Sequence, residues 1–186
     1  ILQQLFNSVD TAVVGRFASS QALAAVGSNS SLISLMINLF IGISLGSNVV
    51  IAHYIGQKSE KNIHAAVHTA IVVAILSGVF VMILGQFIAK PVLLLMGTPE
   101  DVIDLAVLYL RIYLIGMPFI MLYDFGSSIL RSTGDSKRPL YSLIVAGIVN
   151  TVLNLILVIV FKLGVSGVAI ATVISNVVSS SIVMVI

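Results

Sequence analysis

The sequence predicts an all-α, polytopic membrane protein, built as a bundle of six transmembrane helices. Of its 186 residues, 59% are hydrophobic and only 9% are charged, which leaves too little polar surface to cover a water-soluble domain. The apolar residues form blocks long enough to cross a bilayer as helices, whereas a transmembrane β-barrel would show short alternating segments. The chain begins and ends inside apolar segments, so we expect it to be part of a longer protein.

The six expected helices are separated by short polar or weakly apolar stretches. They cover about residues 1–17, 31–54, 63–87, 99–130, 139–161 and 165–186. The stretch 18–27 is only weakly apolar and is predicted to be a connector. Lys90 and Pro91 are predicted to end the third helix, because proline cannot donate the backbone hydrogen bond of a helix interior.

The fourth helix has the clearest start signal and a predicted kink. Thr98 is suited to cap its first turn, Pro99 suits the first helical position, and two acids follow directly. Gly116 and Pro118 fall inside the same apolar stretch. Proline removes one hydrogen bond from the helix, so we expect a kink at this point.

The basic residues between the helices indicate the orientation of the bundle. The turns after the second and fourth helices carry Lys58, Lys61, Arg131, Lys137 and Arg138. The opposite turns carry Arg16, Lys90 and Lys162. Because Lys and Arg are enriched in the cytoplasmic loops of membrane proteins, the turns after the second and fourth helices are predicted to be cytoplasmic.

Asp10 is the carboxylate of the otherwise apolar first helix. An ionised carboxylate is costly to place in hydrocarbon, so its side chain is expected to face protein or water. Acids inside membrane spans often lie on ion or proton pathways. We therefore predict that Asp10 carries a proton or a cation.

Three further polar residues are expected at the depth of Asp10. Counted from the helix ends, Asp10 lies roughly 9 Å below the outer boundary, and Asn154 and Thr172 each lie roughly 12 Å below it. Asn150 is one turn from Asn154 on the same face. Oxygen ligands of this kind suit a proton or a hard cation such as sodium. Alternatively, the amides and the hydroxyl only hold helices together, but an acid at the same depth favours a functional site.

Two other polar residues are predicted to support this site. Asn7 precedes Asp10 by three residues and shares its face. Asp124 is a second intramembrane acid, which is expected to reach the interface, pair with a neighbour or line a cytoplasmic-side cavity. His64 and His68 are four residues apart, but His53 is the only other histidine near them in the sequence, so no metal site is predicted. No nucleophile–base set is present, so we do not expect an enzyme.

Several short motifs follow one another along the whole chain. They are Asn7-x-x-Asp10, Val14-Gly15, Ala22-Leu23-Ala24-Ala25-Val26-Gly27, Leu130-Arg131-x-x-Gly134-Asp135-x-x-x-Pro139, Val149-Asn150-x-x-Leu153-Asn154 and Gly164-Val165-x-Gly167-Val168-Ala169-x-Ala171-Thr172. In this order and spacing they resemble the MATE family, the multidrug and toxic compound extrusion transporters. The resemblance implies a twelve-helix transporter of two six-helix lobes, with residues 1–186 as the N-terminal lobe.

The resemblance also implies an activity and a site. Family members are multi-pass proteins of the cell membrane, plasma or inner, and export compounds against inward proton or sodium flow. The family's cation site in this lobe matches Asp10, Asn150, Asn154 and Thr172. Some relatives carry Asp in place of Asn154, so the site here holds one formal negative charge. A single charge favours a proton over sodium as the coupling ion.

The expected partners follow from the same resemblance. They are small organic compounds of cationic or amphipathic, drug-like character, the lipid bilayer, and a C-terminal six-helix lobe of the same chain. No nucleic acid is expected, and no cofactor beyond the coupling proton or sodium.

Two other functions remain compatible with the sequence. A lipid-linked oligosaccharide flippase of the same superfamily would need a cationic cavity for phosphate, and the mid-membrane segments lack Lys. An uncoupled channel or a passive membrane scaffold is the alternative from another class. A channel would be recognised by a substrate flux that is not coupled to an ion gradient.

Overall fold

The computed structural model describes residues 2–186, with side chains from Gln4 onward, and every regular element in this range is a helix. The helices are α1 (Leu2–Phe17), α2 (Ser20–Gly56), α3 (Glu60–Leu95), α4 (Ile103–Ile115), α5 (Met117–Ser132), α6 (Lys137–Leu155), the π-helical turn η1 (Ile156–Val160) and α7 (Val165–Val185). The predicted all-α class is confirmed.

The helices form one membrane bundle. Four of them, α2, α3, α6 with η1, and α7, are each long and apolar enough to cross a membrane. The helices α4 and α5 are long and apolar enough only as a pair, which is bent by 47° between them. By length and composition, the described residues thus hold four such helices, or five spans if the bent pair is counted as one, and the 16-residue α1 packs in the same bundle. The six spans expected from the sequence stay a prediction.

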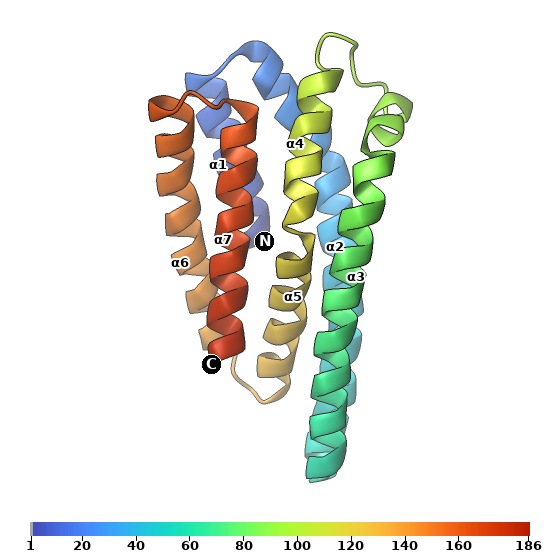
Figure 1. Cartoon of the computed structure of the whole chain (residues 1–186). Coiled ribbons are helices and arrows are strands. Elements are labelled where there is room, and N and C mark those ends of the chain that lie inside the picture. The colour runs from blue at the N-terminus through green and yellow to red at the C-terminus, as the bar shows by residue number, and fades with distance from the viewer. Residues whose placement is uncertain (1) are drawn as a thin grey trace.

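The long helices α2 and α3 run antiparallel and extend beyond the turn that joins α5 to α6 (Figure 1). The bent span α4–α5 packs against α2 and α3 on one side and against α7 on the other. Helix α1 contacts α2, α6 and α7. Side chains from α1, α2, α4 and α7 share one buried apolar core, which holds these helices at fixed positions around the interior.

The predicted connector 18–27 is wrong, because helix α2 already begins at Ser20. The hydroxyl of Ser19 accepts a hydrogen bond from the backbone N–H of Ala22 at 3.1 Å and caps the helix. The residues that follow include several alanines, the strongest helix formers. Low hydrophobicity therefore did not indicate a loop here.

The predicted end of the third helix at Lys90 and Pro91 is also wrong, because α3 continues to Leu95. Its end is set by Gly97, which has a φ of +76°. The N–H of Gly97 bonds the carbonyl of Leu94, and the N–H of Thr98 bonds that of Leu93, at 3.0 and 3.2 Å. This pair of bonds is a Schellman motif, which satisfies the last carbonyls of the helix.

The fourth span starts later than predicted and kinks where predicted. Pro99 accepts hydrogen bonds from the N–H groups of Val102 and Ile103 in a turn, and α4 begins only at Ile103. The kink falls at Gly116, between α4 and α5. There the backbone of Pro118 lies so close to Gly78 of α3 that a Cβ at position 78 would overlap it. The close approach fixes the bent span against α3.

Candidate cation site

Asp10 lies on α1 and is fully buried, with an exposed fraction of 0%. Three other helices donate hydrogen bonds to its carboxylate. Asn154 Nδ2 of α6 donates to Oδ1 at 2.8 Å. Thr172 Oγ1 of α7 and Tyr109 Oη of α4 donate to Oδ2 at 2.8 and 3.2 Å. All three donors are neutral, so the negative charge is stabilised by dipoles alone.

The neighbours of Asp10 also bond one another and close a ring. Asn154 Nδ2 donates to Asn150 Oδ1 at 3.2 Å, and Asn150 Nδ2 donates to Thr172 Oγ1 at 3.1 Å. Thr172 then donates to Asp10. The structure therefore brings together the four residues that the sequence predicted, Asp10, Asn150, Asn154 and Thr172.

Tyr109 is the member of the site that the sequence analysis missed. It lies eight residues after Asp101, so the depth count used for the other residues places it roughly 12 Å below the outer boundary. The ring of a tyrosine is apolar and typical of a hydrophobic core. Only its hydroxyl group is polar and can belong to a site of this kind. Asn29 of α2 supports this part of α4, because its Nδ2 donates to the carbonyl of Ala106 at 3.0 Å.

The chemistry of the site is that of neutral oxygen ligands around one charge. The Oδ1 atom of Asn154 is buried and has no hydrogen-bond partner among residues 2–186. The hydroxyls of Thr172 and Tyr109 can accept as well as donate hydrogen bonds. A proton on Asp10 could therefore be shared with a hydroxyl oxygen, and a hard cation would find carboxylate, amide and hydroxyl oxygens.

Asn7, a predicted supporting residue, is buried but lies outside the ring. Neither Oδ1 nor Nδ2 of its amide has a hydrogen-bond partner in the described part of the chain. Asn7 lines a groove of about 460 Å³ between α1 and α2. The polar residues of this groove are Gln4, Asn7, Ser8, Thr11, Ser30 and Ser34. Such a surface in a membrane span faces protein or water rather than lipid.

Asp124, the second predicted supporting residue, is buried on α5 with an exposed fraction of 5%. Helix α5 contributes no residue to the ring around Asp10. The supporting role of Asp124 therefore stays a prediction. Within residues 2–186, no group of three His, Cys, Asp or Glu side chains is placed to hold a metal ion.

Comparison with known proteins places this architecture in a defined group. The profile of the MatE family matches residues 1–156. "Probable multidrug resistance protein YoeA" of Bacillus subtilis is 39% identical over 189 residues, which cover 100% of this chain and 41% of that protein. "Probable multidrug resistance protein YpnP" of the same organism is 30% identical, with 94% of this chain and 39% of that protein covered.

Solved structures show the same arrangement of helices. The structure described as "Crystal structure of MATE in the bent conformation" matches with a TM-score of 0.93 and 28% sequence identity. The match covers 98% of this chain and 40% of that one. The chain thus spans about two fifths of the length of the relatives it matches.

Proposed function

The chain belongs to the MatE family, and on this premise we propose that it forms the N-terminal lobe of a cation-coupled exporter of small organic compounds. The family's members are transporters rather than enzymes. In the proposed cycle, Asp10 binds the coupling cation, and the same lobe contributes to the binding of a drug-like, cationic or amphipathic substrate. The protein is a multi-pass protein of the cell membrane.

The observation that carries the proposal is the buried carboxylate of Asp10 with its neutral donors on α4, α6 and α7. A purely structural contact between helices does not need a charge, and burying one in a membrane is costly. Because four helices meet at Asp10, a cation bound there changes contacts that hold the bundle together. A ligand that binds one arrangement of the helices better than another shifts the equilibrium between them.

Coupling requires that the cation and the substrate favour different arrangements. The polar groove between α1 and α2 is lined by residues on both sides of Asp10 in the sequence, Asn7 before it and Thr11 after it. We propose that polar groups of the substrate bind on this side of α1, while the cation binds at Asp10. Each ligand would then alter the affinity for the other, and by linkage the effect is reciprocal.

The test is the Asp10→Asn variant of the full-length protein in vesicles with an imposed ion gradient. We expect gradient-driven export to be lost while folding is retained. The new amide can still accept from Asn154 and can donate to the hydroxyl oxygens of Thr172 and Tyr109. No basic partner is among its hydrogen-bonding neighbours, so no opposite charge is stranded.

The matched control is Asp104→Asn, which removes the same charge from an exposed position in the first turn of α4. This control should export at the natural rate. Thermal stability and expression of both variants are measured alongside transport. Full gradient-driven export by Asp10→Asn would exclude Asp10 as the coupling site.

A further inference from the structure

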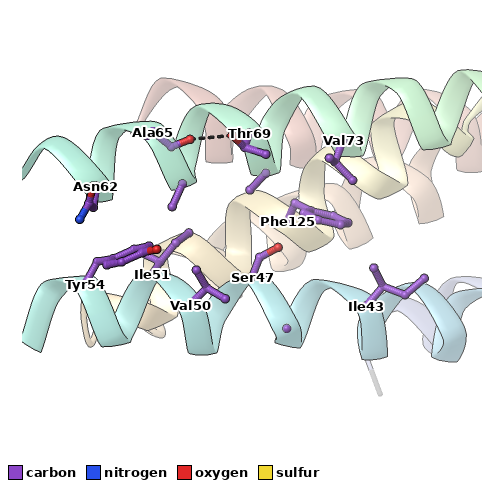
Figure 2. A pocket seen from close by; sticks show the side chains of 13 residues that line it. Ile43, Ser47, Val50, Ile51, Tyr54, Asn62, Ala65, Thr69, Val73 and Phe125 are labelled. Carbon is purple, nitrogen blue, oxygen red and sulfur yellow. Dashed lines mark hydrogen bonds between the residues drawn. The ribbon is translucent and has the colours of Figure 1, made fainter.

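A second groove lies between α2 and α3, at the end of the bundle predicted to be cytoplasmic. Its volume is about 490 Å³, within the range of roughly 300–1,000 Å³ that is usual for ligand pockets. Small residues leave it open, among them Gly46 on α2 and Ala66 on α3. Phe125 of α5 closes it from behind, between the two helices (Figure 2).

The groove straddles the expected inner boundary of the membrane. Lys90 lies near the outer end of α3, and a hydrocarbon core of about 30 Å corresponds to about 20 helical residues. The inner boundary therefore crosses α3 near Ala70. Val73 lies on the hydrocarbon side of this level, and Asn62 lies on the aqueous side.

The lining changes from apolar to polar along the same direction. Ile43 and Val73 face each other at one end, and Tyr54 and Asn62 lie at the other (Figure 2). Tyr54 follows Ile43 by eleven residues, which corresponds to roughly 16 Å of helix. About 5 Å of this length, between Val73 and the level of Ala70, lies on the hydrocarbon side of the boundary, and the rest lies on the headgroup and aqueous side. The shape and polarity suit a lipid headgroup together with the first part of an acyl chain, which enters the bilayer at the apolar end.

The charge beside the polar end is positive. Lys58 lies in the turn that joins α2 to α3, and Lys61 lies in the first turn of α3. Both side chains are exposed. Glu60 is the acid between them. Lysines at the cytoplasmic surface of a membrane attract anionic lipid headgroups.

We propose that this groove binds one anionic phospholipid of the cytoplasmic leaflet. The first part of one acyl chain lies between α2 and α3 beside Ile43 and Gly46, and the headgroup lies in the groove beyond Gly46, on the side of Lys58 and Lys61. The site is separate from Asp10, which lies toward the opposite end of the bundle. It does not depend on the proposed coupling mechanism.

The first experiment maps where a lipid binds. The full-length protein is reconstituted in phosphatidylcholine vesicles that contain a minor fraction of phosphatidylglycerol with a photoreactive group in its acyl chain. After illumination, labelled peptides are identified by mass spectrometry. We expect label within residues 43–73. Absence of label there would show that another part of the protein covers the groove and would overturn the proposal.

A pair of glycine variants tests the groove itself. Nothing lies within 4 Å of a Cβ added at Gly46 or at Gly42. Gly46 lines the groove and Gly42 does not. We expect Gly46→Leu to remove most of the label from residues 43–73 and Gly42→Leu to retain it. Equal labelling of the two variants would contradict the proposal.

A second pair tests the headgroup. A photoreactive phosphatidylcholine should label the groove less than phosphatidylglycerol does, by roughly fivefold for each lysine that contributes. The double variant Lys58→Asn, Lys61→Gln should remove this preference. The control is Lys162→Asn with Lys90→Gln, which removes equal charge from the opposite side. Lys58 and Lys162 share a positive φ, 51° and 53°, that asparagine tolerates. Equal labelling by both lipids in the natural protein would overturn the anionic preference.

Discussion

Asp10 bonds three neutral side chains, Tyr109, Asn154 and Thr172. Its charge is therefore held by oriented dipoles rather than by a basic residue. A dipole such as a hydroxyl can reverse its direction when Asp10 takes up a proton, whereas a lysine or arginine has no acceptor and would keep donating. A site of this composition can accept a proton without leaving a buried positive charge behind.

The choice of ion is testable at Asn154. Its Nδ2 lies 2.8 Å from Asp10 Oδ1, so the Asn154→Asp variant would set two carboxylate oxygens against each other. Like charges at that distance need a shared proton or a cation between them. We expect the natural protein to be driven by a pH gradient and this variant to gain transport driven by sodium. Transport in vesicles with either gradient imposed alone measures both.

The control for this experiment is Gln57→Glu, which also converts an exposed amide to a carboxylate but lies at the C-terminal end of α2, away from the ring around Asp10. It should leave the ion dependence unchanged. If the natural protein is driven fully by sodium at constant pH and zero potential, and not by protons, the inference from a single charge is wrong.

At the scale of single elements, the break between α4 and α5 depends on α3. The backbone of Pro118 lies against Gly78, so a methyl group at position 78 has no room. We expect Gly78→Ala to destabilise the bundle by about 1–3 kcal/mol, the usual cost of overpacking. Thermal unfolding of the purified protein measures it.

The matched substitution is Gly42→Ala, where a Cβ meets open space. Alanine favours a helix over glycine by about 1 kcal/mol, so this variant should be as stable as the natural protein or more so. An equal or higher melting temperature for Gly78→Ala would show that Pro118 can move away and that the close approach does not fix the break.

The helices themselves show what the sequence could and could not predict. Depth along a helix follows from residue counts, and for this reason Asp10, Asn150, Asn154 and Thr172 could be grouped in advance. Tyr109 could not be selected, because its side chain is apolar except for one atom. Pro91 was misread as a helix end, because a proline in a membrane helix costs one hydrogen bond and does not by itself stop the helix.

At the scale of the whole molecule, the orientation of the bundle can be measured by labelling. The chain has no cysteine. A single introduced cysteine is therefore the only thiol in this part of the protein, and its labelling shows on which side of the membrane it lies. We expect a cysteine at the exposed position Ser136 to react only with reagents that reach the cytoplasm. One at exposed Glu100 should react from outside.

The comparison is made in intact cells with a membrane-impermeant thiol reagent, before and after permeabilisation. A cysteine-free version of the full-length protein provides the background. Reaction of the Ser136 cysteine in intact cells would reverse the orientation, and it would move the groove between α2 and α3 to the outer leaflet.

The ring around Asp10 also has a consequence for the order in which the protein is made. The partners of Asp10 follow it by 99, 144 and 162 residues. During synthesis, α1 therefore enters the membrane with a polar residue whose partners do not yet exist. Its carboxylate must stay near water or the insertion machinery until α7 has been added. Helix α1 is thus synthesised before its partners and is among the last helices of the described bundle to reach its final position.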